Sequence, residues 1–384
     1  MKNPIFINGN GSISALGTDK NSVVNSYKKA KNTFSLDEAT GVPVSKLAVD
    51  AEQELTQLQQ EDQRYKRLDR SVLMAIFAAR QCIQSAGWQD GDYGINIGSS
   101  RGATGLFENY HQGFLDDQRV HPLTSPTTTL GNIASWVGQD LHNSGIRFSH
   151  SITCSTALHA MLNGIAWLDS GMSNRFLIGG SEAPLTPFTI NQMQSVKLYS
   201  KSSTDDACQS LQFDKTENTL VLGEAAAVFA LSHSADHATA KITGYGFASE
   251  KISNHTAISA DAQCFQDSMQ AALQKAGKSS IDLVVMHAPG TLKGDLAEYK
   301  AIEKTFNELP VLTTNKWKIG HSFGASGAMS LEMALLMLEE QKVFENPYYK
   351  LDSNFTAGNQ QLKSIMVNSV GFGGNAVSVI VERV

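Results

Sequence analysis

The chain alternates short apolar runs that suit β-strands with longer runs of helical periodicity. The β-like runs are 4–9, 93–99, 146–153, 175–181, 226–232, 283–289 and 378–384. The helix-like runs lie between several of them, at 70–87, 155–171, 262–277 and 328–342. Glycines often fall at the ends of these runs, as expected where strands turn sharply into helices. The pattern predicts an α/β protein.

Two parts of the chain repeat one order of elements. Residues 71–102 run as helix, Ala-Gly stop, loop, strand and polar turn, and residues 264–291 repeat that order. A helix rich in small residues follows in each part. A shared order of elements predicts two fused α/β halves, 1–235 and 236–384, with a site between them. We expect the polar segment from 182 to 214 to form surface loops and a cap.

Composition and charge narrow the classes of function. The chain is 41% hydrophobic and 18% charged with a net charge of -6, which is ordinary globular composition. Without a Lys/Arg run, we expect neither a nucleic-acid surface nor an anionic-membrane surface. No run approaches the roughly 20 apolar residues that span a bilayer, and the first residues do not resemble a signal peptide. Four cysteines without paired spacing predict no disulfide scaffold, no metal site and a reduced, cytoplasmic protein.

Cys154 stands between a β-like run and a helix-like run. A helix N-terminus offers unpaired N–H groups and the positive end of the helix dipole. We therefore expect the pKa of this thiol to be lowered and N–H donors to be available for an oxyanion. Position alone leaves two interpretations open, since free cysteines are often simply buried.

Three further clusters bear on that choice. His287 ends a β-like run, and His321 precedes a small-residue helix, with Lys316 five residues before it. A Gly-Phe-Gly-Gly turn, 371–374, separates two strand-like runs. Each also has a structural explanation, as a capping histidine, a surface lysine or a tight loop. One cysteine and two histidines in matching places of two halves nevertheless favour a catalytic site.

Several spaced motifs carry a family resemblance over nearly the whole chain. They are, in order, "CSTALHA", "FDKTENTLVLGEAAAVFAL", "HAPGTLKGDLAE", "NKWKIGHSFGASGA" and "NSVGFGGN". The chain resembles the β-ketoacyl-acyl-carrier-protein synthases of the elongating Cys-His-His type, within the thiolase-like superfamily. The resemblance implies two pseudo-duplicated α/β halves that form a five-layered αβαβα core. It also implies a catalytic trio of Cys154, His287 and His321.

The resemblance implies a decarboxylating condensation that lengthens an acyl chain by two carbons in fatty-acid or polyene/polyketide biosynthesis. Cys154 would accept the acyl group, with its own N–H and that of Phe372 forming the oxyanion hole. His287 and His321 would stabilise the enolate formed as malonyl thioester loses CO2. Lys316 would tune this pair or anchor the site, and a purely structural role for it stays open. No cofactor is expected beyond the phosphopantetheine arm of the carrier protein.

The chain departs from the family pattern at five positions. Ala288 and Pro289 replace a usual Gly-Thr pair, and Val370 stands where a second Phe is common. Ser330 replaces a frequent Glu, which leaves the partner of Lys316 open. Met193 lies where the family often has Phe.

By the same resemblance, a few residues border the substrate. Thr291 would contact the pantetheine arm, and Gly371 and Gly373 would belong to the loop beside it. Met193 and Phe107 would lie near the acyl chain. Phe107 predicts a pocket for a short, flat or aryl chain, although a core phenylalanine on a helix stripe is the alternative.

The expected partners are an acyl carrier protein with its acyl and malonyl thioesters and a second ketosynthase-like chain. That chain would be a second copy or a chain-length factor, with this chain as the active subunit of the heterodimer. A basic docking patch for the acidic carrier would include Lys66, Arg67, Arg70 and Arg101.

Other activities fit the residues less well. A thiolase would place a second cysteine in the C-terminal Gly-rich segment, but none follows Cys264. A CoA-priming synthase would carry Asn where this chain has His321. A non-catalytic chain-length factor would typically lack Cys154.

Overall fold

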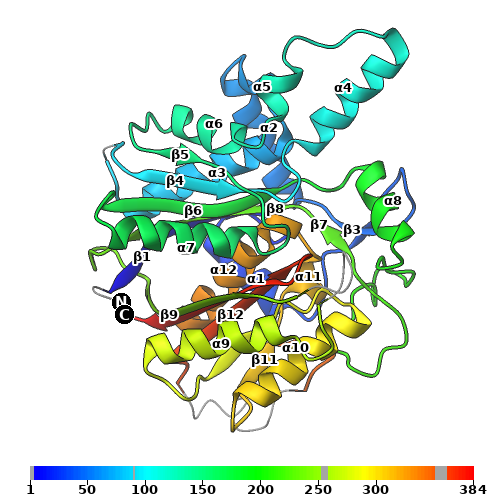
Figure 1. Ribbon diagram of the computed structural model, residues 1–384. Helices are drawn as coiled ribbons and strands as arrows, with labels where there is room; N and C mark the ends of the chain where they lie inside the picture. The colour runs from blue at the N-terminus through cyan, green and yellow to red at the C-terminus, as the bar shows by residue number, and fades with distance from the viewer. Residues whose placement is uncertain (1–3, 90, 252–257, 351–360) are drawn as a thin grey trace.

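The computed structural model describes residues 4–89, 91–251, 258–350 and 361–384 (Figure 1). Its main feature is a ten-stranded sheet in the order β11-β10-β12-β13-β9-β1-β8-β6-β4-β5. The strands of the first half are β1 (Ile5–Ile13), β4 (Gly94–Gly98), β5 (Arg147–Phe148), β6 (Arg175–Glu182) and β8 (Ala225–Ser232). Those of the second half are β9 (Ala240–Ser249), β10 (Leu283–Val285), β11 (Val311–Thr313), β12 (Ser364–Gly371) and β13 (Asn375–Arg383).

Helices and a small sheet surround these strands. The helices of the first half are α1 (Lys20–Lys28), α2 (Val49–Glu61), α3 (Arg70–Ala86), α4 (Thr104–Asp117), α5 (Thr124–Thr128), α6 (Asn132–Asp140), α7 (Thr156–Asp169) and α8 (Pro187–Ser195), with the 3₁₀ turn η1 (Tyr65–Arg67). Those of the second half are α9 (Gln263–Ala276), α10 (Leu292–Thr305), α11 (Lys316–Ile319) and α12 (Ser326–Glu340), with η2 (Phe323–Ala325). The small sheet pairs β2 (Ser35–Leu36), β3 (Pro43–Ser45) and β7 (Leu222–Gly223).

The two five-stranded parts of the main sheet match strand for strand. In the first, β5, β4 and β6 are parallel, and β8 and β1 continue the sheet antiparallel. In the second, β11, β10 and β12 are parallel, and β13 and β9 continue it antiparallel. The parts join where β1 pairs with β9, with Ile5 opposite Ile242. The repeated order of elements in the sequence is therefore a repeat of structure.

The helices turn this sheet into five layers. Helix α3 covers the outer face of the first part, and α9 covers the outer face of the second. Helices α7 and α12 pack against each other between the two parts (Figure 1). The five-layered αβαβα core of two pseudo-duplicated halves is thus confirmed.

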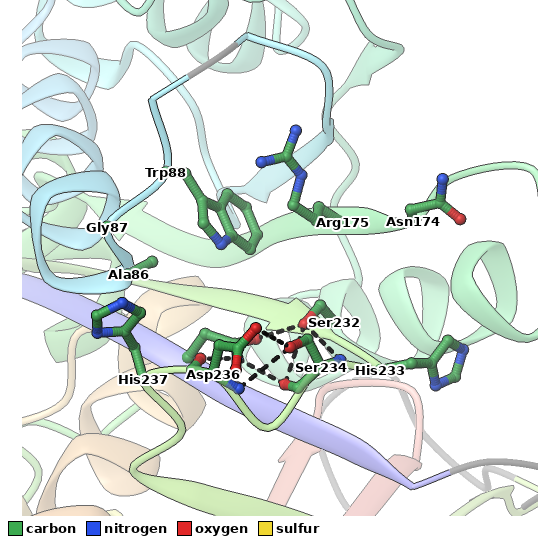
Figure 2. A pocket seen from close by; sticks show the side chains of 11 residues that line it. Ala86, Gly87, Trp88, Asn174, Arg175, Ser232, His233, Ser234, Asp236 and His237 are labelled. Carbon is green, nitrogen blue, oxygen red and sulfur yellow. Dashed lines mark hydrogen bonds between the residues drawn. The ribbon is translucent and has the colours of Figure 1, made fainter.

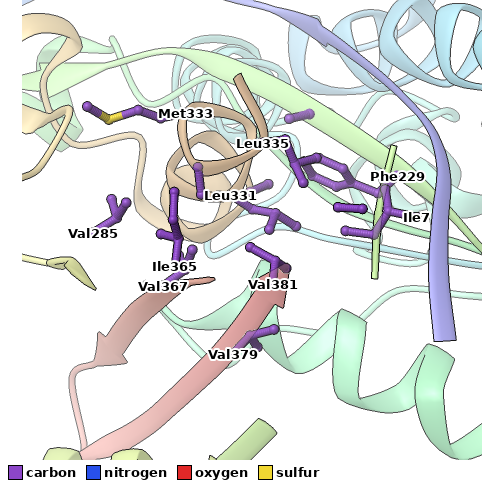
Figure 3. Packing of buried hydrophobic residues seen from close by; sticks show 14 of the residues in the cluster. Ile7, Phe229, Val285, Leu331, Met333, Leu335, Ile365, Val367, Val379 and Val381 are labelled. Carbon is purple, nitrogen blue, oxygen red and sulfur yellow. The ribbon is translucent and has the colours of Figure 1, made fainter. Parts of the chain in front are cut away.

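The inner strands β4, β6, β8, β10 and β12 are buried on both faces, which explains why apolar residues dominate them. On β8, Phe229 faces the middle layer and Val228 the outer layer, and on β10 Val285 and Val284 do the same. Figure 3 shows the middle layer, where side chains of α12 lie between strands of both halves. Its labelled residues are Ile7, Phe229, Val285, Leu331, Met333, Leu335, Ile365, Val367, Val379 and Val381.

Glycines in the first strand of each half let the outer helix come close. A Cβ at Gly11 of β1 would lie 2.3 Å from the Ala78 carbonyl oxygen of α3. A Cβ at Gly246 of β9 would lie 2.0 Å from the Ser268 carbonyl oxygen of α9. Both distances are far below contact, so only glycine fits. The equivalent strands β1 and β9 thus use one packing device.

The strand prediction was wrong in part. Of the run 146–153, only Arg147–Phe148 forms a strand, because the residues that follow bend toward α7. Strands β9 and β11 were not predicted, since their glycines and short length weaken the apolar pattern. The segment 182–214 contains a helix, α8, besides its loops. The boundary between 235 and 236 stays a prediction.

Within the described parts of the chain, no helix is both long enough and apolar enough to cross a membrane.

We predict that Gly246→Ala lowers the free energy of unfolding by about 1–3 kcal/mol, because the added methyl forces β9 and α9 apart. Gly113→Ala in α4 is the control, since a Cβ there meets nothing within 4 Å. That change should add about 0.5–1 kcal/mol through helix propensity. Urea unfolding of both variants measures the difference, and equal stabilities would refute the packing argument.

Candidate active site

Cys154 lies directly before Ser155, the N-cap of α7, as the sequence indicates. It is 6% exposed, and its carbonyl oxygen accepts hydrogen bonds from Ser326 Oγ at 3.3 Å and Ser369 Oγ at 3.1 Å. Ser326 begins α12 and Ser369 belongs to β12. The loop that carries the cysteine of the first half is therefore held by two elements of the second half.

The pKa of the Cys154 thiol is raised, whereas the sequence predicts a lowered value. Burial first, and the nearby Glu182 charge second, raise the pKa of Cys154 to about 12, although Lys316 lowers it. Losing water costs a thiolate more than the helix N-terminus returns. The prediction of a lowered thiol pKa is wrong for this chain, and Cys154 is a neutral thiol at pH 7.

Backbone strain gathers at the three candidate residues. Thr153, directly before Cys154, has φ 47, Ala288 after His287 has φ 22, and Phe323 two residues after His321 has φ 37. Left-handed backbone is costly for residues with a Cβ, above all for β-branched threonine. Such strain persists where surrounding contacts fix the conformation, and it is typical of functional sites.

Two buried carboxylates of α10 shape the loop from His287 to Thr291. Glu298 accepts the backbone N–H groups of His287 and Ala288, each at 2.9 Å. Asp295 accepts those of Gly290 at 3.1 Å and Thr291 at 3.0 Å, and it pairs with Lys215 Nζ at 2.9 Å. His287 follows β10 by two residues and is fixed through its backbone by this helix. Thr291 lies at the other end of the loop, as the N-cap of α10.

His321 lies between α11 and the small-residue helix α12, as the sequence indicates. Its backbone N–H donates to Val221 O at 2.7 Å, and its carbonyl oxygen accepts from Gly223 N at 3.2 Å. The small strand β7 therefore holds the backbone of this histidine in place.

The two histidines meet edge to face. Their ring centroids are 5.1 Å apart and the planes are inclined by 87°. Burial, followed by the Lys316 charge, lowers the pKa of His321 to about 3. Burial first, then His321 and then the Lys316 charge lower the pKa of His287 well below its ordinary value. Both imidazoles are therefore neutral near pH 7, so each ring has one N–H donor and one acceptor nitrogen.

Lys316 is buried beside this pair and has neutral partners. Its Nζ donates to Asn315 Oδ1 at 2.9 Å and to Ser330 Oγ at 3.1 Å. Ser330 thus stands opposite Lys316, at the position where the sequence left the partner open. Burial lowers the pKa of Lys316 to about 8, opposed chiefly by Glu298.

The Gly-rich turn joins β12 to β13 next to the cysteine loop. A Cβ at Gly371 would lie 1.9 Å from Thr153 Oγ1, so the turn needs glycine there. Thr153 Oγ1 donates to Phe372 O at 3.4 Å, and Phe372 is 36% exposed. Gly373 has φ 98, which suits glycine.

Of the two predicted acyl-chain residues, one packs with Cys154. Met193 of α8 shares a buried apolar cluster with Cys154 and Phe323. Phe107 lies on α4, which projects from the body, and is 57% exposed (Figure 1). Its ring stacks on His111 rather than on a residue of that cluster.

The four basic residues expected to dock a carrier lie near the start of α3. Lys66 and Arg67 are exposed in η1, directly before it. Arg70 is engaged by Glu224 and Glu52, and Arg101 donates to Gln192 Oε1 at 2.6 Å. Lys66 and Arg67 are therefore more accessible to a carrier protein than Arg70 and Arg101.

A cavity of about 680 Å³ lies elsewhere, at the start of β6 and the end of β8 (Figure 2). Its lining includes Trp88, Arg175 and Asp236. Polar side chains there bond to the lining itself, as Asn8 Nδ2 does to Asp236 O at 2.7 Å. The candidate catalytic residues take no part in it.

Sequence reasoning did not single out Glu182, which ends β6. Its buried carboxylate accepts from Ser99 Oγ at 2.9 Å, Ser100 N at 2.6 Å, Arg101 N at 3.0 Å and Gly324 N at 3.0 Å. Burial raises its pKa to about 7. This carboxylate ties the loop before α4 to the loop after His321. The sequence signal that could have identified Glu182 is its position directly after the apolar run 175–181.

Comparisons with known proteins show which family the chain resembles in sequence. Residues 3–237 match the family model "Beta-ketoacyl synthase, N-terminal domain", and residues 239–349 match "Beta-ketoacyl synthase, C-terminal domain". The chain is 28% identical to 3-oxoacyl-[acyl-carrier-protein] synthase 2 of Staphylococcus aureus over 98% of this chain and 97% of the relative.

Solved structures share the fold over the whole chain. A β-ketoacyl synthase of Burkholderia phymatum has a TM-score of 0.86 at 22% identity, covering 100% of both chains. The ishigamide ketosynthase/chain length factor has a TM-score of 0.86 at 18% identity, covering 100% of this chain and 99% of the other.

We predict that His321 stays neutral at pH 5 and that the pKa of His287 lies below that of an exposed histidine. Because a base is protonated only below its pKa, a pKa of about 3 keeps the His321 ring uncharged at pH 5. NMR of protein labelled with 15N in histidine, assigned with His287→Gln and His321→Gln, measures this directly. An imidazolium signal at pH 5 that is lost in His321→Gln would contradict the effect of burial.

Proposed function

The chain belongs to the β-ketoacyl synthase family, and we propose that it is a decarboxylating β-ketoacyl-acyl-carrier-protein synthase. Its substrates would be acyl and malonyl thioesters on the phosphopantetheine arm of a carrier protein, with no further cofactor. The match of both family halves and the named relative support this. We place the enzyme in the cytoplasm, in fatty-acid or polyene/polyketide biosynthesis, with halves at 1–235 and 236–384.

The first step would transfer the acyl group to Cys154. The sulfur attacks the thioester carbonyl, a new S–C bond forms, and the carrier thiol leaves with the proton. The N–H groups of Cys154 and Phe372 would stabilise the tetrahedral oxyanion. Because the free thiol is neutral, its proton must move as the sulfur attacks, and the Lys316 charge favours the thiolate that develops.

The second step would form the carbon–carbon bond. Malonyl thioester loses CO2, and the electron pair of the broken bond becomes an enolate. His287 and His321 would each donate an N–H to its oxygen, and the carbanion would attack the carbonyl carbon of acyl-Cys154. The C–S bond would break and release the Cys154 thiolate, which would then take up a proton from solvent. The two neutral imidazoles support this assignment, because a neutral ring can donate to the enolate without quenching the carbanion by proton transfer. Their ring centroids lie 5.1 Å apart, and the Lys316 charge that acts on both rings also acts on Cys154.

Mass spectrometry tests both steps on the purified protein. With a panel of acyl-carrier proteins, we expect an acyl adduct on Cys154 and condensation with malonyl-carrier protein. Cys154→Ala should abolish the adduct, and Cys208→Ala, another buried thiol, should retain it.

The double variant His287→Ala/His321→Ala separates the steps. It should still acylate Cys154 but lose malonyl decarboxylation by about 10²-fold or more. An adduct that persists in Cys154→Ala would overturn the nucleophile, and unchanged decarboxylation would overturn the enolate mechanism.

A second candidate is the active subunit of a heterodimer with a ketosynthase-like chain-length factor. Helix α4 supports a partner of some kind, because Phe107, Phe114 and Leu115 are 57%, 38% and 52% exposed on it. A partner chain covering α4 would bring Phe107 out of water, as its proposed role in limiting chain length requires. The carrier would dock near Lys66 and Arg67.

The protein purified alone separates these cases. We expect a dimer in analytical ultracentrifugation that condenses substrates, since such apolar area is rarely left in water. Leu115→Glu should weaken that dimer, and Leu36→Glu, which changes another exposed leucine, should not. An inactive chain that gains activity only with a chain-length factor would favour the heterodimer.

A further inference from the structure

A cluster of buried polar side chains lies behind Lys316, where α1, α11, α12 and β1 meet. Beyond Lys316 and Ser330, its members are Tyr27, Asn315, Glu332 and Ser12, each at most 4% exposed. Tyr27 and Ser12 come from the first half, and Asn315 and Glu332 from the second. The cluster is outside the group of residues to which we assign the chemistry.

The members form a chain of contacts. Lys316 Nζ donates to Asn315 Oδ1 at 2.9 Å, and the Asn315 side chain lies close enough to the Tyr27 hydroxyl to lower its pKa. The Glu332 carboxyl lies near the same hydroxyl and raises that pKa, and its Oε1 accepts from Ser12 Oγ. A hydrogen bond thus links Lys316 to Asn315, and the Tyr27 hydroxyl is influenced by both Asn315 and Glu332.

Three atoms of this polar cluster are buried without a hydrogen-bond partner among the described residues. They are Tyr27 Oη, Asn315 Nδ2 and Glu332 Oε2. Such groups are nearly always paired in folded proteins, because a buried donor or acceptor without a partner loses its hydrogen bonds to water and gains none in return. A buried water typically has about three polar partners, and these three supply a donor, an acceptor and a hydroxyl that can be either.

We propose that one internal water joins Tyr27, Asn315 and Glu332, and that Glu332 acts through it as a positioning residue for Lys316. Asn315 Nδ2 would donate to the water, and the water would donate to Glu332 Oε2. The direct hydrogen-bond partners of Lys316 are neutral. Glu332 would supply the negative charge from one hydrogen-bonded group further away.

The charge of Lys316 affects the pKa values of Cys154, His287 and His321, so a link between Glu332 and Lys316 would affect these site residues too. The groups around it are Glu298, Cys208, Cys154 and Asp295, which raise its pKa, and His287 and His321, whose pKa values it lowers. Burial brings the pKa of Glu332 to about 7 and that of Lys316 to about 8. Near pH 8 the Glu332 carboxylate is therefore charged and favours the protonated form of Lys316. At pH 6 Lys316 is protonated whether or not Glu332 carries a charge.

The inference rests on the proposed function only for the place of Lys316 beside the trio, so its test does not use condensation. We would measure the rate at which iodoacetamide alkylates Cys154, by mass spectrometry, in Glu332→Gln. A fall of half a unit in the pKa of Lys316 leaves about half as many protonated lysines at pH 8. We expect about twofold slower alkylation at pH 8 and an unchanged rate at pH 6.

Glu339→Gln is the matched control, because Glu339 lies on the same helix and is exposed beside Lys20. It should leave both rates unchanged, and Tyr27→Phe should reproduce part of the effect at pH 8. Equal rates in Glu332→Gln and the parent chain, or equal slowing at both pH values, would overturn the role of Glu332. A high-resolution crystal structure should show one water within hydrogen-bond distance of all three atoms, and direct bonds among them instead would overturn the water site.

Discussion

The middle layer is the constraint on which the site depends. Helices α7 and α12 are equivalent helices of the two halves, and they share the space between the two parts of the sheet. Because they pack together, the loops before their N-termini meet. Cys154 precedes α7, His321 precedes α12, and Ser326 at the start of α12 holds the carbonyl oxygen of Cys154. The duplication therefore brings the loop that carries Cys154 of one half to the start of the helix that follows His321 of the other.

Burial then sets the charge state of everything in that space. Without water, ionised forms are expensive, so the histidines are neutral, the thiol is protonated and the lysine is less basic. The carboxylates avoid much of the cost by accepting several hydrogen bonds, as Glu298 and Glu182 do from backbone N–H groups. These bonds also fix the strained loops, so one set of contacts provides both electrostatics and geometry.

Local sequence features made the layered fold and the three central residues predictable. Apolar runs gave most strands, and Cys154, His287 and His321 each stand beside a run or among small residues. The thiol pKa was not predictable, because it depends on how much water the second half excludes. The partner of Lys316 required the helical phase of α12 in space, which places Ser330 opposite the ammonium group. The paired glycines of "INGNG" in β1 and "ITGYG" in β9 form a repeat in the sequence that would have identified β9 as the equivalent of β1.

The shared middle layer also has a consequence during synthesis. The inner faces of β1 and β8 are complete once the ribosome has passed residue 232, but α12 ends at Glu340. At ordinary translation rates of 5–20 residues per second, that interval lasts roughly 5–20 seconds. Throughout it, the part of the inner face of β8 that α12 covers in the finished protein stays without that cover.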